Sequence, residues 1–331
     1  MRAYSGELPF RDAPEAVADA KLRVIEDAPA FEVAQSRGGS VYRRAFRQGA
    51  ILVPRIFWLV ERKSVGRLGS DPSAPLVTSR RSAQEKRPWR AAQSVENRVE
   101  AEFLRPALLG ESILPYRVFR AFEAVVPMTE RGLVLDAEAA ANRGHSDLHG
   151  WLTQAERIWG LYNKSSRTLA DQLDYTRQLS AQFPVAPTRI VYAKAGTLPA
   201  ACVIRDARAV IDHKLYWMAP AGEDEARYLA AILNSETARA RAAQYQSRGQ
   251  RGARDFDKVM FNLPIPRFDA TISLHAALTG AEAEAERLAT AVELPEGIRF
   301  QQARRFVRTA FAEAGLSQRI DSLVTRLLDA G

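Results

Sequence analysis

Residues 188–218, TRIVYAKAGTLPAACVIRDARAVIDHKLYWM, decide the fold. They contain three apolar runs rich in β-branched and aromatic residues, TRIVYAK, ACVIRD and AVIDHKLYWM, with Gly196 between the first two. Short runs of this kind predict strands, here arranged as a small β-meander. An acidic triplet at 223–225 then predicts the start of a helix that continues through Leu233 on helical apolar spacing. Strands followed by helices predict an α+β fold.

The chain before this stretch also carries short, strand-like patterns. KLRVIE, FEVAQ and SVYRRAF alternate in part within residues 21–46, and the apolar run ILVPRIFWLV follows at 51–60. Pro54 in that run has no N–H donor, so we expect it at a sheet edge or a bulge. Residues 64–90 contain several Gly and Pro residues and predict a long loop with one short strand at 76–78.

Helical patterns appear next. Residues 97–109 predict a short helix broken at the Arg105-Pro106 peptide, because the residue before a proline avoids helical backbone; YRVFRAFEAVVPM then returns to strand character. Asp136 is expected to cap the short helix DAEAAAN. Apolar residues at helical spacing within 151–162 predict a longer amphipathic helix.

The rest of the chain is helical in pattern. Ser235 is expected to cap a helix that runs to Gln244, and apolar stripes at 274–292, 303–311 and 320–328 predict two or three packed helices. We therefore expect a β-rich core of short strands and helices, followed by a C-terminal helical bundle segment.

Composition excludes several classes of protein. The chain has 331 residues, 47% of them hydrophobic and 26% charged, which is typical of a packed globular protein and not of a disordered one. It has no apolar run of about 18 residues and no signal-peptide pattern, so we expect a cytoplasmic protein without a membrane span. Its single cysteine, Cys202, excludes an internal disulfide or a cysteine-based zinc site and is expected to be a small buried hydrophobe.

The charge balance favours an acidic partner. There are 47 Lys and Arg against 39 Asp and Glu, a formal net charge of +8. Part of the excess is concentrated between residues 37 and 67, where the only acid is Glu61 and the cations are Arg37, Arg43, Arg44, Arg47, Arg55, Arg62, Lys63 and Arg67. Clustered positive charge is typical of proteins that bind nucleic acid.

A second basic segment lies at 245–269, YQSRGQRGARDFDKVMFNLPIPRFD. It joins a Gly-Arg-rich loop to a predicted short strand and then to two prolines. The two glycines, Gly249 and Gly252, let backbone approach a phosphate. The cations of the loop have the charge and the donors to bind phosphates or guanine edges, although a solvated surface loop has the same composition.

This region resembles the C-terminal target-recognition region of adenine-N6 DNA methyltransferases of restriction-modification systems, especially the large single-chain type II kind. In that family a strand pair like IDHKLYWM precedes a helix like EARYLAAILNS, and a Gly-Arg-rich loop leads to a Leu-Pro-Ile-Pro-x-Phe-Asp motif, here at 263–269. QGAILVPRIFWLVER, VEAEFLRPALLGESILPYRVF and AVVPM resemble segments placed between the catalytic domain and the recognition core. The resemblance covers residues 48–269.

Two motifs of that family are absent from the sequence, the Phe-x-Gly-x-Gly cofactor loop and the Asn/Asp-Pro-Pro-Tyr/Phe catalytic loop. The resemblance therefore implies a chain that binds double-stranded DNA and has no catalytic residues or cofactor of its own. Methyl transfer, base flipping and S-adenosylmethionine would belong to a catalytic domain absent from this chain, in the same parent chain or in a separate subunit.

The resemblance also implies a division of labour along the chain. Residues 1–135 would be a β-rich part that joins the catalytic domain, 136–270 the target-recognition core, and 271–331 the C-terminal helical segment. We expect DNA contacts from Arg43, Arg44, Arg47, Arg87, Arg90, Arg248, Gly249, Arg251, Gly252, Arg254 and Lys258. The loop arginines are candidates for base contacts and the three within 43–47 for phosphate contacts.

Two weaker patterns suggest metal sites. His145 and His149 are spaced i, i+4, but without a catalytic glutamate a polar helix-entry loop is the favoured interpretation. Asp206 with Asp212 and Lys214 has the outline of a metal nuclease site, although a charged strand end explains it more simply. We assign no metal.

Two rival functions remain open. A basic assembly or scaffold module would use its helical C-terminus to bind another subunit, and an RNA-binding protein would match the GXXG form of residues 249–252. Trp89 stands among cations and has the composition of a DNA wedge, although core packing is favoured. DNA binding predicts that the arginines of 37–67, 80–90 and 248–258 converge on one concave face; a scaffold predicts that they scatter.

Overall fold

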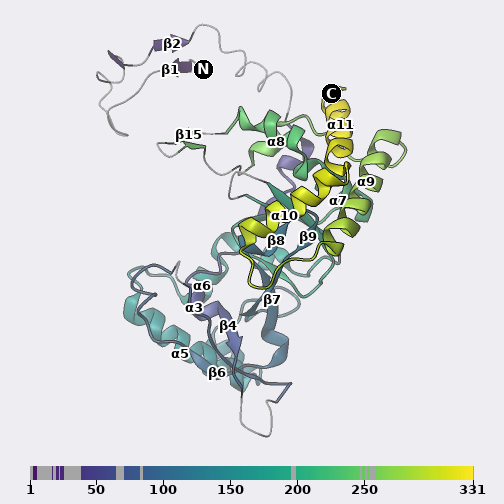
Figure 1. Ribbon diagram of the computed structural model, residues 1–331. Helices are drawn as coiled ribbons and strands as arrows, with labels where there is room; N and C mark the ends of the chain where they lie inside the picture. The colour runs from purple at the N-terminus through teal and green to yellow at the C-terminus, as the bar shows by residue number, and fades with distance from the viewer. Residues whose placement is uncertain are drawn as a thin grey trace.

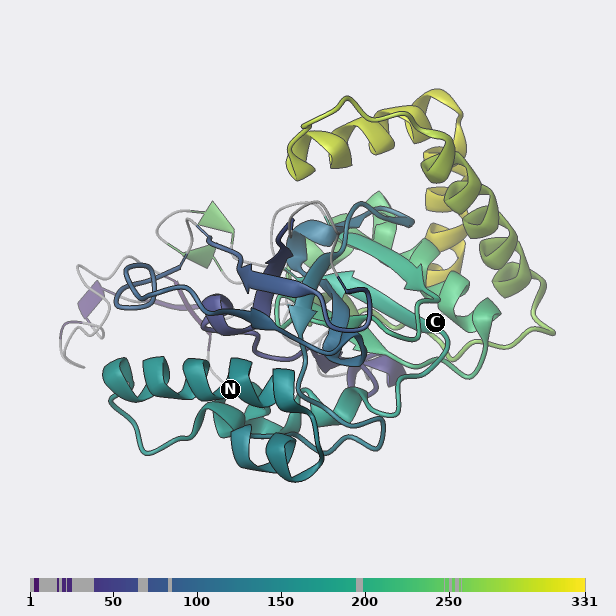
Figure 2. The same ribbon diagram turned by 90° about the horizontal axis from the view of Figure 1, so that it is seen from below.

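The computed structural model of the chain (Figures 1 and 2) describes residues 39–64, 71–82, 85–194, 199–246, 256 and 258–330. It also describes residues 17, 20 and 21 and the backbone of four short strands outside these ranges. These strands pair as two antiparallel ribbons, β1 (Ala3–Ser5) with β2 (Arg23–Ile25) and β15 (Arg248–Gly249) with β16 (Gly252–Ala253). The fold is α+β, as predicted.

A four-stranded antiparallel sheet lies beside the C-terminal helices. Its strands, in sheet order, are β12 (Ala200–Ile204), β11 (Arg189–Ala193), β14 (Leu215–Met218) and β3 (Arg47–Gln48). Every side chain of β11, β12 and β14 is buried, which explains why these runs are almost continuously apolar. β12 is an edge strand, and its outward backbone groups at Ala201 are paired by the side chain of Asn234. The Asn234 amide donates to the Ala201 carbonyl and accepts from the Ala201 N–H, both at 2.9 Å.

A second sheet has six strands. In sheet order they are β13 (Val210–Ile211), β7 (Leu104–Leu108), β10 (Phe122–Val125), β4 (Leu59–Arg62), β5 (Leu76–Ser79) and β6 (Glu96–Arg98). Only the pairing of β13 with β7 is parallel among these described strands. A separate ribbon of β8 (Ile113–Leu114) and β9 (Arg117–Val118) follows β7 in the chain.

The two sheets meet at residues 210–218, where β13 pairs with β7 in the six-stranded sheet and the next strand, β14, belongs to the four-stranded sheet. There the Ala50 N–H donates to the Ile211 carbonyl at 2.7 Å, and the His213 N–H donates to the Ala50 carbonyl at 2.8 Å. Gly49 packs against this junction. A Cβ atom at Gly49 would lie 2.3 Å from the Ile211 oxygen and 2.4 Å from the Asp212 oxygen, so only glycine fits.

Helices lie along one side of the six-stranded sheet, where Figure 2 shows the longer ones, between residues 137 and 173, in teal beside the blue strands. They are α3 (Arg55–Trp58), α4 (Ala137–Asn142), α5 (Ser146–Tyr162) and α6 (Leu169–Leu173). The apolar stripe of α5, from Leu148 to Trp159, is buried in the core of this half. The Trp151 indole N–H donates to the Phe57 carbonyl at 3.1 Å and so fixes α5 against α3.

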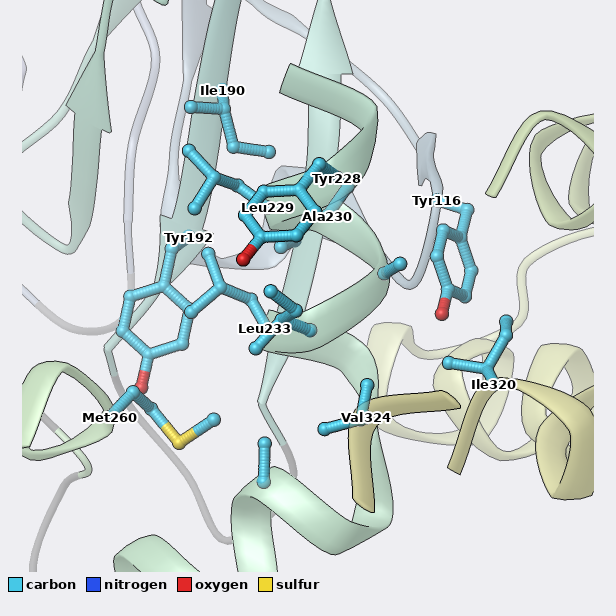
Figure 3. Close-up of a cluster of buried hydrophobic side chains, with 14 of the residues drawn as sticks. Tyr116, Ile190, Tyr192, Tyr228, Leu229, Ala230, Leu233, Met260, Ile320 and Val324 are labelled. Carbon is cyan, nitrogen blue, oxygen red and sulfur yellow. The ribbon is translucent and has the colours of Figure 1, made fainter. Parts of the chain in front are cut away.

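The remaining helices form the C-terminal part of the chain. They are α7 (Glu223–Asn234), α8 (Glu236–Ala243), α9 (Ser273–Ala291), α10 (Phe300–Glu313) and α11 (Leu316–Asp329). Figure 3 shows how α7 joins sheet to bundle, with its Leu229 and Leu233 near Ile190 and Tyr192 of β11 on one side and Val324 of α11 on the other. All of these side chains belong to one buried cluster.

Six short 3-10 helices complete the described structure. They are η1 (Val41–Arg43), η2 (Ala101–Phe103), η3 (Gly110–Ser112), η4 (Tyr175–Arg177), η5 (Ser180–Gln182) and η6 (Val259–Asn262).

Several local expectations are confirmed. The Asp136 carboxylate caps α4 by accepting from the Ala139 N–H at 2.8 Å, and Ser235 caps α8 through the Ala238 N–H at 3.1 Å. The helices expected after residue 222 and at the C-terminus, the strand at 23–25 and the strand near 76–78 are present. Cys202 is fully buried. The FEVAQ run lies outside the described residues.

Other expectations are wrong because tertiary contacts outweigh the local pattern. SVYRRAF forms η1 and not a strand, since the Ser40 hydroxyl accepts from the Tyr42 N–H at 3.1 Å. Pro54 stands immediately before α3, so it lies at the start of a short helix and not at a sheet edge or a bulge. Residues 97–109 form β6, η2 and β7 and no α-helix.

The expected meander and the strand after the Gly-Arg-rich loop also differ from the structure. β13 joins the six-stranded sheet, so β14 lies beside β11 and the sheet order is not that of a meander. The residues after the loop form η6, whose Met260 and Phe261 are buried. Separate domains at 1–135, 136–270 and 271–331 remain a proposal.

Candidate nucleic-acid interface

Two lysines from distant segments meet on one tyrosine ring. Tyr216 of β14 has the Lys258 ammonium 5.4 Å and the Lys194 ammonium 5.6 Å from its ring centroid. Lys194 directly follows β11, and Lys258 directly precedes η6. The negative face of an aromatic ring attracts such cations, so the tyrosine holds both lysines near one point of the surface.

Arg43 of η1 and Arg44, which follows it, lie next to this point. The Lys258 ammonium donates to the Arg43 carbonyl at 3.1 Å, and the Arg43 guanidinium donates to the Asn262 side chain. Arg43 and Arg44 are exposed. We call Arg43, Arg44, Lys194 and Lys258 the cationic surface.

A buried tyrosine fixes η1 in place. The Tyr42 hydroxyl donates to the Glu225 carboxylate at 2.9 Å and accepts from the Phe268 N–H at 2.8 Å, and burial raises its pKa. These bonds tie η1 to α7 and to the Leu-Pro-Ile-Pro-x-Phe-Asp motif. The motif therefore helps to position Arg43 and Arg44.

Three cations of the cationic surface are not paired with acids of the described residues. Within the described ranges, Arg43, Arg44 and Lys194 form no salt bridge. Other cations of the same sequence cluster do: Arg62 binds Glu123 at 2.7 Å and Lys63 binds Glu96 at 2.6 Å. Only part of the basic stretch at 37–67 is therefore free to bind an external anion.

Arg47 lies nearby in the chain but in a separate hollow. It is exposed on β3 and lines a groove of about 570 Å³ together with Arg131 and Arg177. Sequence reasoning missed Arg131 and Arg177, because each is an isolated cation in a turn. Only the folded chain brings them beside Arg47.

Arg87 and Arg90 lie in a different environment. Arg87 lines a second groove with Trp89, Trp159 and Tyr162, and Arg90 is exposed. The Trp89 ring stacks on Trp159 with centroids 5.1 Å apart and planes at 8°. Packing of Trp89, the favoured interpretation, is confirmed.

The Gly-Arg-rich loop is described only in its backbone. Arg248 and Gly249 pair with Ala253 and Gly252 as an antiparallel ribbon. Arg251 and Arg254 lie outside the described residues. The prediction that the arginines of 37–67, 80–90 and 248–258 converge on one concave face therefore stays a prediction.

The weaker metal-like patterns have ordinary structural partners. The His149 ring contacts the Ala137 carbonyl at 2.9 Å, whereas His145 stands at the start of α5, 3.7 Å from the Glu102 carboxylate. Buried Asp212 contacts the His213 ring at 3.0 Å and accepts from the Lys214 N–H at 3.0 Å. In the described parts of the chain, no three His, Cys, Asp or Glu side chains converge as a metal site.

None of the described helices is long and apolar enough to cross a membrane.

Comparisons with known proteins give a partial likeness of fold. No model of a known protein family and no curated protein matches the sequence. The type IIL restriction-modification enzyme MmeI, solved in complex with DNA, aligns with a TM-score of 0.46 and 11% identity over 70% of this chain and 28% of its own. The type IIG restriction endonuclease BpuSI aligns with a TM-score of 0.35 and 13% identity over 91% of this chain and 33% of its own. The chain spans about a third of the length of either solved protein.

Proposed function

We propose that this chain is the DNA-binding target-recognition region of a site-specific adenine-N6 DNA methyltransferase of a restriction-modification system. The observation that supports it is the cationic surface, in which three distant chain segments bring cations together around Tyr216. Duplex DNA carries one negative charge per roughly 1.7 Å of its axis, so a surface of this kind gains free energy by releasing counterions from it.

The cationic surface and the Gly-Arg-rich loop have different roles in this proposal. Arg43, Arg44 and Arg47 hold backbone phosphates and set the orientation of the duplex. Arg248, Arg251 and Arg254 contact base edges, where a forked guanidinium matches the two acceptors of guanine. The end of the loop is close to the cationic surface in sequence, because Lys258 stands four residues after Arg254.

The chemical step belongs to another domain in this proposal. A catalytic domain would bind S-adenosylmethionine, take the adenine out of the duplex and transfer the methyl group. The residues of this chain would position that domain on its site by holding the DNA. Its partners are therefore double-stranded DNA and the catalytic domain.

A salt titration tests the proposal. Binding of the chain to a fluorescent duplex of about 25 base pairs is followed by anisotropy between low and moderate salt. Four phosphate contacts predict a log–log slope near −4, at about −0.9 for each contact. A chain that binds no duplex at low salt would favour the alternative, a basic assembly module of a larger complex.

A further inference from the structure

The groove beside β3 collects positive charge from three separate parts of the chain. Arg47 comes from β3, Arg131 from the turn before Gly132, and Arg177 from η4. The groove encloses about 570 Å³, and its lining contains no acidic residue. Its remaining walls include Ser180 and the Phe183 ring.

All three guanidinium groups are available to a ligand. Arg47, Arg131 and Arg177 are exposed, and within the described residues their side chains take part in no hydrogen bond, salt bridge or ring contact. Like charges that share a small space repel one another. An anion in the groove would remove this repulsion.

The Asp174 carboxylate holds the turn that carries Arg177. It accepts from the Leu179 N–H at 2.9 Å and from the Ser180 N–H at 2.8 Å. Thr176 and Arg177 have positive φ angles of 53° and 60°, an arrangement that costs energy for residues other than glycine. The turn is thus held in a strained conformation that places Arg177 at the groove.

A fourth cation stands behind the groove. The Arg105 guanidinium lies 5.1 Å from the centroid of the Phe183 ring, and its Nε atom is buried without a partner among the described groups. Burial and, to a smaller extent, repulsion by Arg208 lower the pKa of Arg105, while Glu130, Glu102 and Asp206 act in the opposite direction. The groove therefore has positive charge in its wall as well as on its rim.

We propose that this groove binds a backbone phosphate of duplex DNA and acts as a clamp beside the cationic surface; the inference rests on the proposed DNA-binding function and deepens it. A phosphodiester has only acceptor oxygens, which match the forked donors of Arg131 and Arg177. Arg47 is three residues from Arg44, at most about 11 Å of chain, so one DNA strand can contact the cationic surface and the groove together.

The test replaces the two arginines that the sequence did not predict. The variant Arg131→Gln/Arg177→Gln keeps a polar, uncharged hydrogen-bonding side chain at each position and removes two charges. The control Arg143→Gln/Arg157→Gln removes two exposed charges, one directly after α4 and one on α5, that line no groove described above. Circular dichroism and thermal unfolding verify that each variant folds.

The clamp predicts that the log–log salt slope for a random duplex becomes shallower by about 0.9 in the groove variant, for the loss of one phosphate contact, and stays unchanged in the control. It also predicts that duplex DNA protects Arg131 and Arg177 of the unmodified chain from phenylglyoxal, as measured by mass spectrometry. Where the groove variant does not fold, protection in the unmodified chain decides the question.

Three results would overturn the clamp. In the first, the unmodified chain binds DNA, the groove variant keeps the same salt slope, and DNA does not protect the two arginines. This result would refute the clamp and leave the proposed DNA binding intact. A chain that binds no duplex would remove both. Equal protection by inorganic phosphate at the same phosphate concentration would identify a site for free anions and not for DNA.

Discussion

A buried glutamate makes the stability of this protein depend on pH. Glu282 of α9 is fully buried, and the closest cation is the Arg227 guanidinium, whose Nε lies 3.6 Å from the carboxylate. Neither carboxylate oxygen has a hydrogen-bond partner among the described residues. Burial, reinforced by the nearby charge of Glu286, raises the pKa of Glu282 to about 8 from an ordinary value of 4.5.

The sign of the effect follows from proton counts. Between pH 4.5 and 8 the folded chain keeps a proton on Glu282 that the unfolded chain has lost, so the free energy of unfolding falls as pH rises. Each pH unit costs about 1.4 kcal/mol, which gives an upper bound of about 5 kcal/mol over the whole window. The stabilisation is complete below pH 4.5 and is lost as pH rises through about 8.

The variant Glu282→Gln replaces the titrating carboxyl with an amide of nearly the same size and shape that cannot ionise. We expect it to match the unmodified chain near pH 5 and to be more stable by about 3–5 kcal/mol near pH 8. Urea unfolding at several pH values, followed by circular dichroism, measures the difference. Glu284→Gln, on the same helix but half exposed in a surface ion pair, is the control and should change stability by less than about 1 kcal/mol. Parallel pH profiles for Glu282→Gln and the unmodified chain would refute the reasoning.

Three further predictions concern the fold and the proposed function. Gly49→Ala should prevent soluble folding or strongly lower the melting temperature in a thermal scan, because its Cβ would collide with the carbonyl oxygens of Ile211 and Asp212. A melting temperature within about 2 °C of that of the unmodified chain would contradict this prediction. The chain alone should transfer no labelled methyl group from S-adenosylmethionine to duplex DNA, and incorporation above background would contradict this. Arg251→Ala should cost about 1–3 kcal/mol on the cognate site and much less on random DNA, whereas Arg44→Ala should weaken both alike in anisotropy titrations; equal losses for Arg251→Ala would show that the loop only holds the backbone.

Long periodic segments could be predicted from the sequence. The apolar stripes of α5, α9, α10 and α11 bury one face each, so a local pattern is enough to identify them. Short elements could not be predicted in the same way. SVYRRAF alternates like a strand, yet Tyr42 is held by Glu225 and Phe268, which are remote in sequence, and the segment folds as η1.

The candidate site shows the same limit. Arg43, Arg44 and Lys258 were identifiable because they stand in basic stretches, and the structure brings Arg43 and Lys258 into contact. Arg131 and Arg177 stand alone in sequence, and only the folded turns place them beside Arg47. A site built from single residues of distant turns leaves no local signal in a sequence.

Charge reversal on the cationic surface tests the central claim most directly. The variant Arg44→Glu/Lys194→Glu and the control Arg143→Glu/Arg157→Glu change net charge equally, so they differ only in where the charge lies. Affinity for a random duplex at low salt is measured by anisotropy for both. DNA binding at the cationic surface predicts a loss on the order of tenfold or more for the first variant and a much smaller one for the control. Equal affinities for the two variants would contradict the account, because binding would then depend on net charge and not on this surface.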